Sequence, residues 1–488
     1  MDQYVLALDI GTSSVRAGLY DCAGNVLPET MVKHERTLTA TDDGGAEIDA
    51  VEALEQVAAA IDDVLKKCSK AKGDITHVAA SSFWHSLVGI DAKGKPTTKV
   101  FGWADTRSRG QVAALRNRFD ETEIHNRTGA RFHSSFWPAK LLWLRKDFPK
   151  VFEKTASWLS FSDLMALKLF GKAATSVSMA SGTGIFDIRT CEWDAAMLRY
   201  LKVKKAALPM IAEDAESFRL TAEFAKRWPR LKDAEFFPAI GDGAANNIGA
   251  GCVRRSKAAL MIGTSGAMRV AFEGDPPAKI PPGLWCYRID RKRMIIGGAL
   301  SDGGGLYSWL KNNFRLREDD DHTEDEIAKR KPAAHGITFL PFLAGERSTG
   351  YHEDASGAII GLKNSHDHID IVQAALESVA YRFAEIFDQL TSVCGIREII
   401  ASGGALRESP VWTQIIADVL GRNMSLPDTR EASSRGAVLL VLGTIGKIED
   451  IAEVETPRGK SFSHNKKRTL IYQTARKTHQ AAYEAVII

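Results

Sequence analysis

Two short glycine-hydroxyl turns are the first candidates for chemistry in this 488-residue sequence: IGTSS at residues 10–14 and IGTSG at residues 262–266. Glycine lets the backbone approach a ligand closely, and the N–H groups and hydroxyls beside it donate hydrogen bonds to phosphate oxygens. One such turn is equally typical of an ordinary hairpin, but two copies behind matching apolar runs predict a pair that binds one polyphosphate across a cleft. The predicted phosphate contacts are Gly11, Thr12, Ser13, Gly263, Thr264, Ser265 and Gly266.

The two turns differ at one position, where the first has Asp9 and the second has Met261. A single carboxylate beside a triphosphate can hold Mg²⁺, usually through water, because this ion keeps much of its hydration shell. A second carboxylate would add negative charge where phosphate charges already gather. We therefore expect Asp9 to lie on the Mg²⁺ side of the site; the alternative is that Asp9 accepts hydrogen bonds from the N–H groups of its own turn.

A third glycine segment lies far along the chain, in EIIASGGALRESPVW at residues 398–412. It predicts a strand that runs into Gly403 and Gly404, followed by a helix. The flat base of a nucleotide could lie against the bare backbone of these two glycines and Ala405. A strand, paired glycines and a helix are equally compatible with an ordinary connection in an α/β protein.

The elements that must position these segments alternate between strands and helices, which predicts an α/β fold. Residues 4–9 and 15–21 form a predicted pair of strands around the first turn, with a helix and a further buried strand after them. The same order of elements restarts near residue 256, about half the chain later. Similarity at that distance indicates duplication of a whole domain, with a boundary near residues 244–257.

Length and composition limit the classes of protein that remain. A chain of this length predicts two or three domains, and 64 basic against 61 acidic residues argue against a nucleic-acid-binding surface over the whole chain. The six cysteines are scattered without a C-x-x-C pair, so we expect no zinc site and a reducing compartment. The start of the chain lacks signal-peptide character, and no apolar run approaches the roughly 20 residues of a membrane helix. We therefore expect a cytoplasmic protein with no membrane partner.

Together with GDGAANNIGAG at residues 241–251 and LPFLAGER at residues 340–347, these motifs resemble the FGGY carbohydrate kinases. The resemblance runs from about residue 4 to about residue 445. It implies two ribonuclease-H-like domains of the actin-like ATPase superfold, with a cleft that closes over ATP, Mg²⁺ and a sugar. On this basis residues 1–250 are the expected sugar-binding domain and residues 251–488 the expected ATP-binding domain.

The resemblance also assigns roles to individual residues. It implies that Asp242 is the catalytic base, which takes a proton from the attacking sugar hydroxyl. From the residues alone, the first interpretation of Asp242 is the cap of a helix that starts near Ala244, and the two roles are compatible. The resemblance implies that Gly304 or Gly305 passes near the phosphates and that residues 403–405 line the adenosine site.

The candidates for sugar binding combine aromatic faces, which cover sugar C–H surfaces, with groups that hydrogen-bond to hydroxyls. They are Trp84, His85, Trp103 and Asp105, together with Asp242. A tryptophan in an α/β chain is also commonly a core residue. Arg107 could meet the carboxylate of an acidic substrate or could be the exposed start of a helix.

Within the family, residues 84–108 and 261–269 look most like the gluconokinase branch, which implies gluconate as the substrate. A kinase of a five-carbon ketose such as xylulose or ribulose would share the ATP-site residues and is the first alternative. The second is a nucleotide-switched binding protein on the same fold. In each case the expected partners are small molecules and not nucleic acid, and the chain could act alone or as a homodimer.

Overall fold

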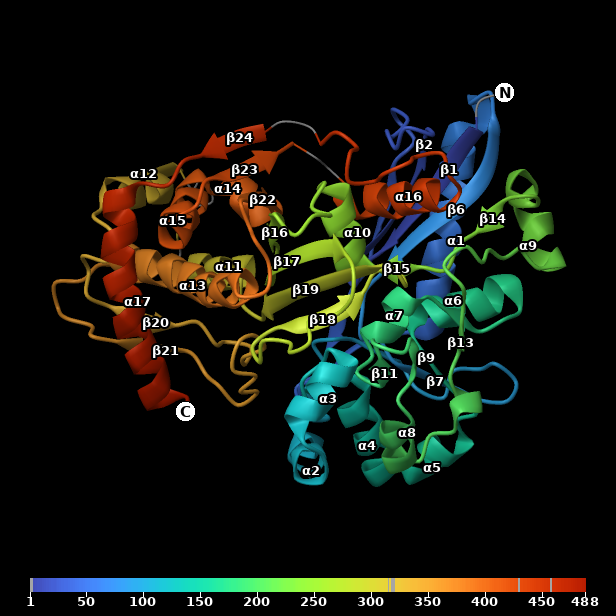
Figure 1. Cartoon of the computed structure of the whole chain (residues 1–488), viewed down its shortest axis with the longest axis horizontal. Helices are drawn as coiled ribbons and strands as arrows, with labels where there is room; N and C mark the ends of the chain where they lie inside the picture. Colours follow the sequence, from blue (N-terminus) through green and yellow to red (C-terminus); the bar gives the residue numbers. More distant parts are fainter. Residues whose placement is uncertain (1–2, 315, 317–320, 429–430, 457–458) are drawn as a thin grey trace.

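The computed structural model describes residues 3–314, 316, 321–428, 431–456 and 459–488. Two α/β lobes make up the molecule, each built on its own sheet, with the N-terminal sheet on the right of Figure 1 and the C-terminal sheet to its left. This arrangement confirms the predicted fold class.

The N-terminal sheet has the strand order β14-β6-β1-β2-β3, with β15 also paired to β6. Its strands are β1 (Gln3–Ile10), β2 (Ser14–Tyr20), β3 (Val32–Glu35), β6 (Asp74–Ser82), β14 (Glu235–Phe236) and β15 (Ile240–Gly241). β1 is antiparallel to β2 and parallel to β6. Its residues from Val5 onward are almost entirely buried, because helices cover both faces of the sheet.

The C-terminal sheet repeats this pattern in the order β18-β19-β17-β16-β22-β23-β24. Its strands are β16 (Lys257–Ile262), β17 (Gly266–Glu273), β18 (Trp285–Arg288), β19 (Arg293–Leu300), β22 (Glu398–Ser402), β23 (Met424–Pro427) and β24 (Gly459–Phe462). β16 is antiparallel to β17 and parallel to β22, as β1 is to β2 and β6. The two sheets therefore share one topology, as a duplicated domain requires.

Capped helices connect the strands within each lobe. In α1 (Ala50–Lys67), the Asp49 side chain accepts hydrogen bonds from two N–H groups of the first turn, and α13 (His368–Thr391) begins with a capping box at Asp367. The C-terminal lobe also contains α11 (Gly304–Phe314), α12 (Asp321–Lys329), α14 (Gly404–Glu408), α15 (Pro410–Leu420), α17 (Lys466–Val486) and the hairpin β20 (Thr338–Leu340) and β21 (Ala358–Ile360).

A smaller unit of helices and short strands lies below the N-terminal sheet in Figure 1. Its helices are α2 (Val112–Arg118), α3 (Glu121–Thr128), α4 (Trp137–Asp147), α5 (Pro149–Lys154), α6 (Phe161–Phe170), α7 (Val177–Ser181) and α8 (Ala195–Leu201), whereas α9 (Ala222–Arg227) lies beside β14 and packs on the core of the N-terminal sheet. Its strands are β4 (Thr39–Ala40), β5 (Ala46–Ile48), β7 (Val88–Ile90), β8 (Val100–Phe101), β9 (Ser157–Leu159), β10 (Ala174–Thr175), β11 (Phe186–Asp187), β12 (Glu192–Trp193) and β13 (Met210–Ile211).

Two helices join the lobes at the centre of the molecule. α10 (Asp242–Gly249) follows the last strand of the N-terminal sheet, and α16 (Ala432–Thr444) follows β23 of the C-terminal sheet. They pack closely because Gly249 and Gly436 leave room for the backbone of the other helix. α16 also lies against β1 and β6, so a helix of the C-terminal half completes a core of the N-terminal half.

The smaller unit is hydrogen-bonded to the edge of the C-terminal sheet. The Cys286 N–H donates to the Gly129 carbonyl at 2.9 Å, and His125 Nε2 lies 2.7 Å from the Leu284 carbonyl oxygen. Burial lowers the pKa of His125 to about 4, so the ring is neutral and donates this hydrogen bond. The lobes are therefore joined both at α10 and α16 and along β18.

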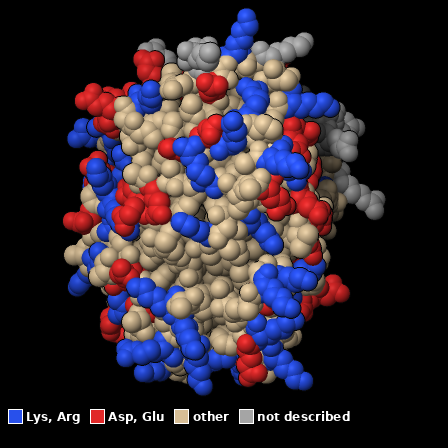
Figure 2. Space-filling model, turned by 90° about the vertical axis from the view of Figure 1, so that its right-hand side faces the viewer, with Lys and Arg blue, Asp and Glu red and all other residues tan. Residues whose placement is uncertain are grey.

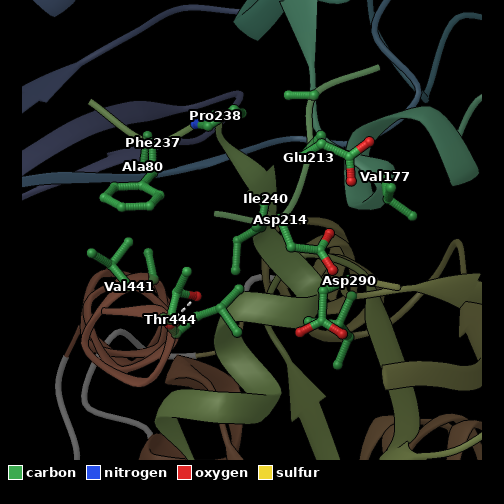
Figure 3. A pocket seen from close by; sticks show the side chains of 15 residues that line it. Ala80, Val177, Glu213, Asp214, Phe237, Pro238, Ile240, Asp290, Val441 and Thr444 are labelled. Atoms are coloured by element: carbon green, nitrogen blue, oxygen red, sulfur yellow. Dashed lines mark hydrogen bonds between the residues drawn. The ribbon is translucent and has the colours of Figure 1, made fainter. Parts of the chain in front are cut away.

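A small pocket of about 50 Å³ lies between the lobes, lined by α16, the residues around β15 and the turn after β18 (Figure 3). Apolar side chains such as Phe237, Ile240 and Val441 form most of its wall. Its carboxylates are already paired: Asp214 accepts from the Arg291 N–H at 3.0 Å, and Asp290 from Arg293 Nη1 at 2.6 Å.

Basic and acidic side chains are interspersed on the face in Figure 2, as in a solvated surface without one dominant sign of charge. Among the described residues, no helix combines the length and the apolar character needed to cross a bilayer.

Candidate active site

A cavity of about 300 Å³ opens between the lobes where the two glycine-hydroxyl turns face each other. The N-terminal half contributes Thr12, Ser13, Trp84, His85, Trp103 and Asp242. The C-terminal half contributes Met261, Gly263, Thr264, Ser265, Gly266, Ala267, Arg269, Trp285, Tyr287, Ala299 and Arg347. The structure thus brings most of the residues singled out from the sequence to one place.

Hydrogen bonds to its backbone hold the first turn in position. The Gly11 N–H donates to the Ser14 carbonyl at 2.9 Å, and Arg36 donates from Nη1 to the Gly11 carbonyl at 3.2 Å. The hydroxyls of Thr12 and Ser13 have no hydrogen-bond partner within the described part of the chain. They are therefore free to donate to a ligand in the cavity.

The second turn is supported from behind by the start of α11. The N–H groups of Gly304 and Gly305 donate to the carbonyls of Gly263 and Thr264, at 2.8 and 2.9 Å. A Cβ at Gly304 would lie 2.5 Å from the Gly263 carbonyl oxygen, so this close approach requires glycine. Gly304 and Gly305 thus position the turn with their N–H groups, which are already engaged.

The third glycine segment meets the other two at the end of β22. A Cβ at Gly403, whose φ is +103°, would lie 2.1 Å from the Ile262 carbonyl oxygen. The Ala405 Cβ comes within 2.9 Å of the Cβ position of Gly304. Residues 403–405 therefore pack against the second turn and the start of α11, with Gly404 exposed, but they are not among the residues that line the cavity.

Asp242 is the first residue of α10 and is the only acidic side chain among the described residues that line the cavity. Its Oδ1 accepts from the Gly243 N–H at 2.7 Å, but the N-cap of α10 is Gly241 and has no side-chain hydrogen bond, so the alternative of Asp242 as the helix cap is not what the structure has. Burial raises the pKa of Asp242 to about 6, and Asp9 adds to the rise while Arg269 opposes it. Near neutral pH the carboxylate is ionised and able to accept a proton.

Asp9 lies at the carboxyl end of β1, where it accepts from Ser81 Oγ at 2.7 Å and pairs with Arg16 at 3.4 Å. Burial raises its pKa above the usual value for aspartate. The carboxylate is thus engaged by the side chains of Ser81 and Arg16. The structure does not have the alternative arrangement, in which Asp9 accepts hydrogen bonds from the N–H groups of its own turn. Met261 occupies the equivalent position in the C-terminal sheet: it lies opposite Ser402 between the parallel strands β16 and β22, as Asp9 lies opposite Ser81 between β1 and β6.

Trp84 forms the wall of the cavity beneath Asp242. Its Nε1 donates to the Ser178 carbonyl at 3.0 Å, and its ring contacts Tyr287 at 5.3 Å between centroids. A Cβ at Gly241 would lie 1.8 Å from the indole, so the strand before Asp242 can approach it only as glycine. Trp84 is both a core residue and part of the cavity lining.

His85 presents one ring nitrogen to the cavity and uses the other for support. Its Nδ1 lies 2.5 Å from the Gly182 carbonyl oxygen, which can only accept, so Nδ1 carries the proton. Burial lowers the pKa of His85 to about 3, so the ring stays neutral. In this tautomer Nε2 carries no proton and can only accept a hydrogen bond.

Trp103 and Arg347 come from opposite lobes and meet at the outer side of the cavity. The Arg347 guanidinium lies 5.1 Å from the centroid of the Trp103 ring. Both also line an adjoining cavity of about 640 Å³ that contains Asp302, Trp309 and Glu353. The aromatic face of Trp103 is thus partly covered by a cation.

Asp105 is one predicted sugar contact that the structure does not bring to the cavity. It is buried and accepts from the Ala46 N–H at 3.2 Å and from Arg107 Nη2 at 2.6 Å. Arg107 also pairs with Glu47 at 2.7 Å. Because Asp105 and Arg107 are engaged with each other and with Glu47 within the N-terminal lobe, neither lines the cavity.

Two arginines in the cavity were not identified as site residues from the sequence. Arg269 lies on β17 beside Gly243, and its Nη1 is buried without a hydrogen-bond partner in the described structure. The Arg347 guanidinium makes no hydrogen bond or ion pair with any residue that the structure describes. The available signals were their positions, three residues after the second turn and at the end of the LPFLAGER motif.

Comparison with known proteins gives similar chains with related activities. The chain is 29% identical over 478 residues to a gluconokinase of Bacillus subtilis, covering 95% of this chain and 92% of that protein. It is 24% identical over 486 residues to a xylulose kinase of Staphylococcus epidermidis, covering 99% and 97% of the two chains.

Solved structures give the same pair of activities. A gluconate kinase from Lactobacillus acidophilus superimposes with a TM-score of 0.91 at 27% identity, covering 100% of this chain and 99% of that one. A ligand-bound xylulose kinase from the same species has the same TM-score and identity over 99% and 98% of the chains.

Two family models match in succession: the N-terminal domain of the FGGY carbohydrate kinases over residues 4–249 and their C-terminal domain over residues 258–442. With a cleft that gathers two hydroxyl turns, a carboxylate and aromatic rings, the chain belongs to the FGGY family and is an ATP-dependent carbohydrate kinase.

Proposed function

We propose that this kinase phosphorylates a sugar acid, with gluconate as the first choice. The observation that carries this proposal is the balance of charge in the cavity. Among its described lining residues, Arg269 and Arg347 are positive, Asp242 alone is negative, and His85 is neutral. Because Arg269 would meet the transferred phosphate, a neutral sugar would leave Arg347 without a charged partner, whereas the carboxylate of a sugar acid would neutralise it.

In the proposed reaction, Asp242 accepts the proton of the attacking hydroxyl as that oxygen bonds to the γ-phosphorus of ATP. The bond from phosphorus to the bridging oxygen breaks, and ADP leaves with its electron pair. A carboxylate with a pKa of about 6 is ionised at neutral pH yet basic enough to take a proton late in a loose phosphoryl transfer. Arg269, beside Gly243, would stabilise the negative charge on the transferred group.

The hydroxyls of Thr12, Ser13, Thr264 and Ser265 would bind the phosphates, and residues 403–405 the adenosine. Asp9 is a buried carboxylate behind the first turn, close enough to raise the pKa of Asp242 although it does not line the cavity, and burial raises its own pKa, which a nearby cation would offset. The described residues contain no cluster of three or more acidic, histidine or cysteine side chains that could hold a metal. Asp9 would therefore hold Mg²⁺ mainly through water, and the ion would supply charge neutralisation for the phosphates.

In the same proposal residues 1–250 form the acceptor-binding domain and residues 251–488 the nucleotide-binding domain. All six cysteines are unpaired, which supports a reducing, cytoplasmic setting.

The test is ADP release by the purified chain with ATP and Mg²⁺ across gluconate, related sugar acids, xylulose, ribulose and glycerol. We expect the highest kcat/KM with gluconate or another sugar acid. A higher kcat/KM with a ketopentose or a polyol would overturn the choice of substrate and leave the kinase activity. ATP hydrolysis that no acceptor stimulates would favour the nucleotide-switched alternative.

A further inference from the structure

The loop of residues 343–355 positions Arg347 at the cavity. It connects β20 to β21 and carries the arginine near its middle. The Arg347 guanidinium contacts the Trp103 ring and makes no hydrogen bond or ion pair with the described residues. Its position therefore depends mainly on the backbone of its own loop. Whatever fixes that backbone therefore sets where the cation meets a substrate.

Glu346, the residue before Arg347, anchors the loop with both carboxylate oxygens. Its Oε1 accepts from the Gly350 N–H at 3.1 Å and from the buried Arg382 of α13. Its Oε2 accepts from the His352 N–H at 3.3 Å. One buried carboxylate thus ties the two sides of the loop together and to the helix behind it.

The C-terminal helix supplies the remaining contact. α17 runs beside β20 and β21 at the outer edge of the C-terminal lobe (Figure 1). Its Tyr483 hydroxyl donates to Glu346 Oε2 at 2.8 Å, and the Tyr483 ring packs against Phe342 and His352. Tyr483 is 4% exposed and Glu346 2% exposed, so water cannot easily replace this hydrogen bond.

We propose that Tyr483 is a positioning residue for the acceptor substrate, which acts through Glu346 on the placement of Arg347. Without the tyrosine hydroxyl, Glu346 loses one of the donors that hold it, and the loop gains freedom at the residue next to Arg347. The proposal rests on the acceptor-binding role of Arg347 under the proposed function. It assigns to the last helix of the chain a part in substrate affinity.

The test compares Tyr483→Phe with a matched control, Tyr472→Phe. Tyr472 lies on the same helix, is 2% exposed, and also donates to a buried carboxylate, Glu377 Oε1, at 3.1 Å. We expect Tyr483→Phe to raise the KM for D-gluconate about tenfold and to change the KM for ATP less than twofold. Tyr472→Phe should lower Tm by a similar amount and leave both KM values unchanged.

Hydrogen exchange separates this inference from the choice of substrate. In the ligand-free protein, amides of residues 343–355 should exchange faster in Tyr483→Phe and at the wild-type rate in Tyr472→Phe. Unchanged exchange, an unchanged acceptor KM, or an equal KM change in the control would overturn the role of Tyr483. If the wild type does not accept gluconate, the proposed substrate fails, and KM is measured with the acceptor that is phosphorylated.

Discussion

At the scale of single residues, the site is governed by charges that the protein leaves uncompensated. Asp242 is buried and has a raised pKa, while the side chains of Arg269 and Arg347 make no hydrogen bond or ion pair within the described structure. A folded protein without a ligand function would pair or expose such groups, because each one costs free energy of folding. In an enzyme that binds two charged substrates, the substrates supply the missing partners.

Asp242→Asn tests the proposed base. Asparagine cannot accept the proton, so kcat should fall roughly 10²-fold or more while ATP still binds. In the wild type, kcat/KM should rise with pH around a midpoint near 6, because Asp242 is protonated and inactive below its pKa. ADP release measured from pH 5 to 8 gives both results.

The control for that experiment is Asp163→Asn, since burial also raises the pKa of Asp163 to about 6 at a site outside the cavity. Its pH profile should keep the wild-type midpoint. Because the raised pKa of Asp242 makes folding less favourable as pH rises from about 4 through 6, Asp242→Asn should also raise Tm at pH 7.5 more than at pH 5. Near-normal turnover in Asp242→Asn would remove it from the role of base.

Arg347→Leu tests the proposed carboxylate contact. Charge-assisted hydrogen bonds contribute about 1.5–3 kcal/mol, so the KM for gluconate should rise roughly 10- to 100-fold. The KM for ATP should change little, and Arg347→Lys should lose less because it keeps the charge. Equal increases in both KM values would instead indicate that the loop as a whole had moved.

The sequence allowed the hydroxyl turns, Asp242 and the aromatic residues to be predicted because each belongs to a local motif. Asp105 and Arg347 could not be assigned in the same way. Asp105 is paired with Arg107 two residues away and accepts a hydrogen bond from the Ala46 N–H. Arg347, in contrast, reaches the cavity only because its loop extends across to Trp103. Whether a charged side chain is paired depends on tertiary contacts, which cannot be inferred from residue type and spacing.

At the scale of elements, the close crossing of α10 and α16 fixes the position of the two sheets relative to each other. A Cβ at Gly436 would lie 1.8 Å from the Ala245 carbonyl oxygen, and one at Gly249 would lie 1.9 Å from the Ala432 carbonyl oxygen. Both obstacles are backbone atoms, which cannot turn aside as a side chain can. The position of Asp242 at the start of α10 therefore depends on this crossing.

Gly436→Ala tests the crossing. Overpacking of this kind costs about 1–3 kcal/mol, so Tm should fall by several degrees. The matched control is Gly443→Ala on the same helix, where the nearest atom to the added Cβ is a side-chain methyl group, Ile451 Cγ2, at 2.9 Å and not a backbone atom. There the better helix propensity of alanine should leave Tm unchanged or higher. Equal losses in both variants would contradict the importance of the crossing.

Element positions were largely predictable, but their buried faces were less so. Periodicity in residues 51–68 predicts a helix with Val51, Val57 and Ile61 on one apolar face, and α1 does bury Val57 and Ile61. Val51 is 53% exposed although Ala50 and Ala53 of the same turn are buried, because at 100° per residue it lies about 120° round the helix from Val57. A repeating pattern gives the helix, but the sheet beneath it decides which residues are covered.

At the scale of the whole molecule, the hydrogen bonds along β18 and the helix crossing join the lobes on separate sides of the active site. Calorimetry of the wild type should therefore give one unfolding transition for both lobes. Gly129→Ala should split it into two, because the added Cβ would lie 1.6 Å from the Cys286 carbonyl oxygen across the interface.

The control is Gly171→Ala. Both glycines end a helix with a left-handed φ, +72° and +73°, so both substitutions carry the same backbone cost. The Cβ at Gly171 would meet only a Thr221 methyl group at 3.7 Å, within one lobe. It should lower Tm and keep a single transition. A split transition in the control would attribute the effect to backbone strain alone.

α16 belongs to the C-terminal half but packs on the N-terminal sheet, and this affects how the chain folds during synthesis. Val5, Ala7, Tyr20 and Ala79 of the first half are covered by α16, which a ribosome makes about 180 residues after the N-terminal half is complete. At roughly 5–20 residues per second, this apolar face stays uncovered for about 10–40 s, until α16 has been synthesised. The first half therefore emerges as an incomplete domain, and chaperones that recognise exposed apolar strands have that interval in which to bind it.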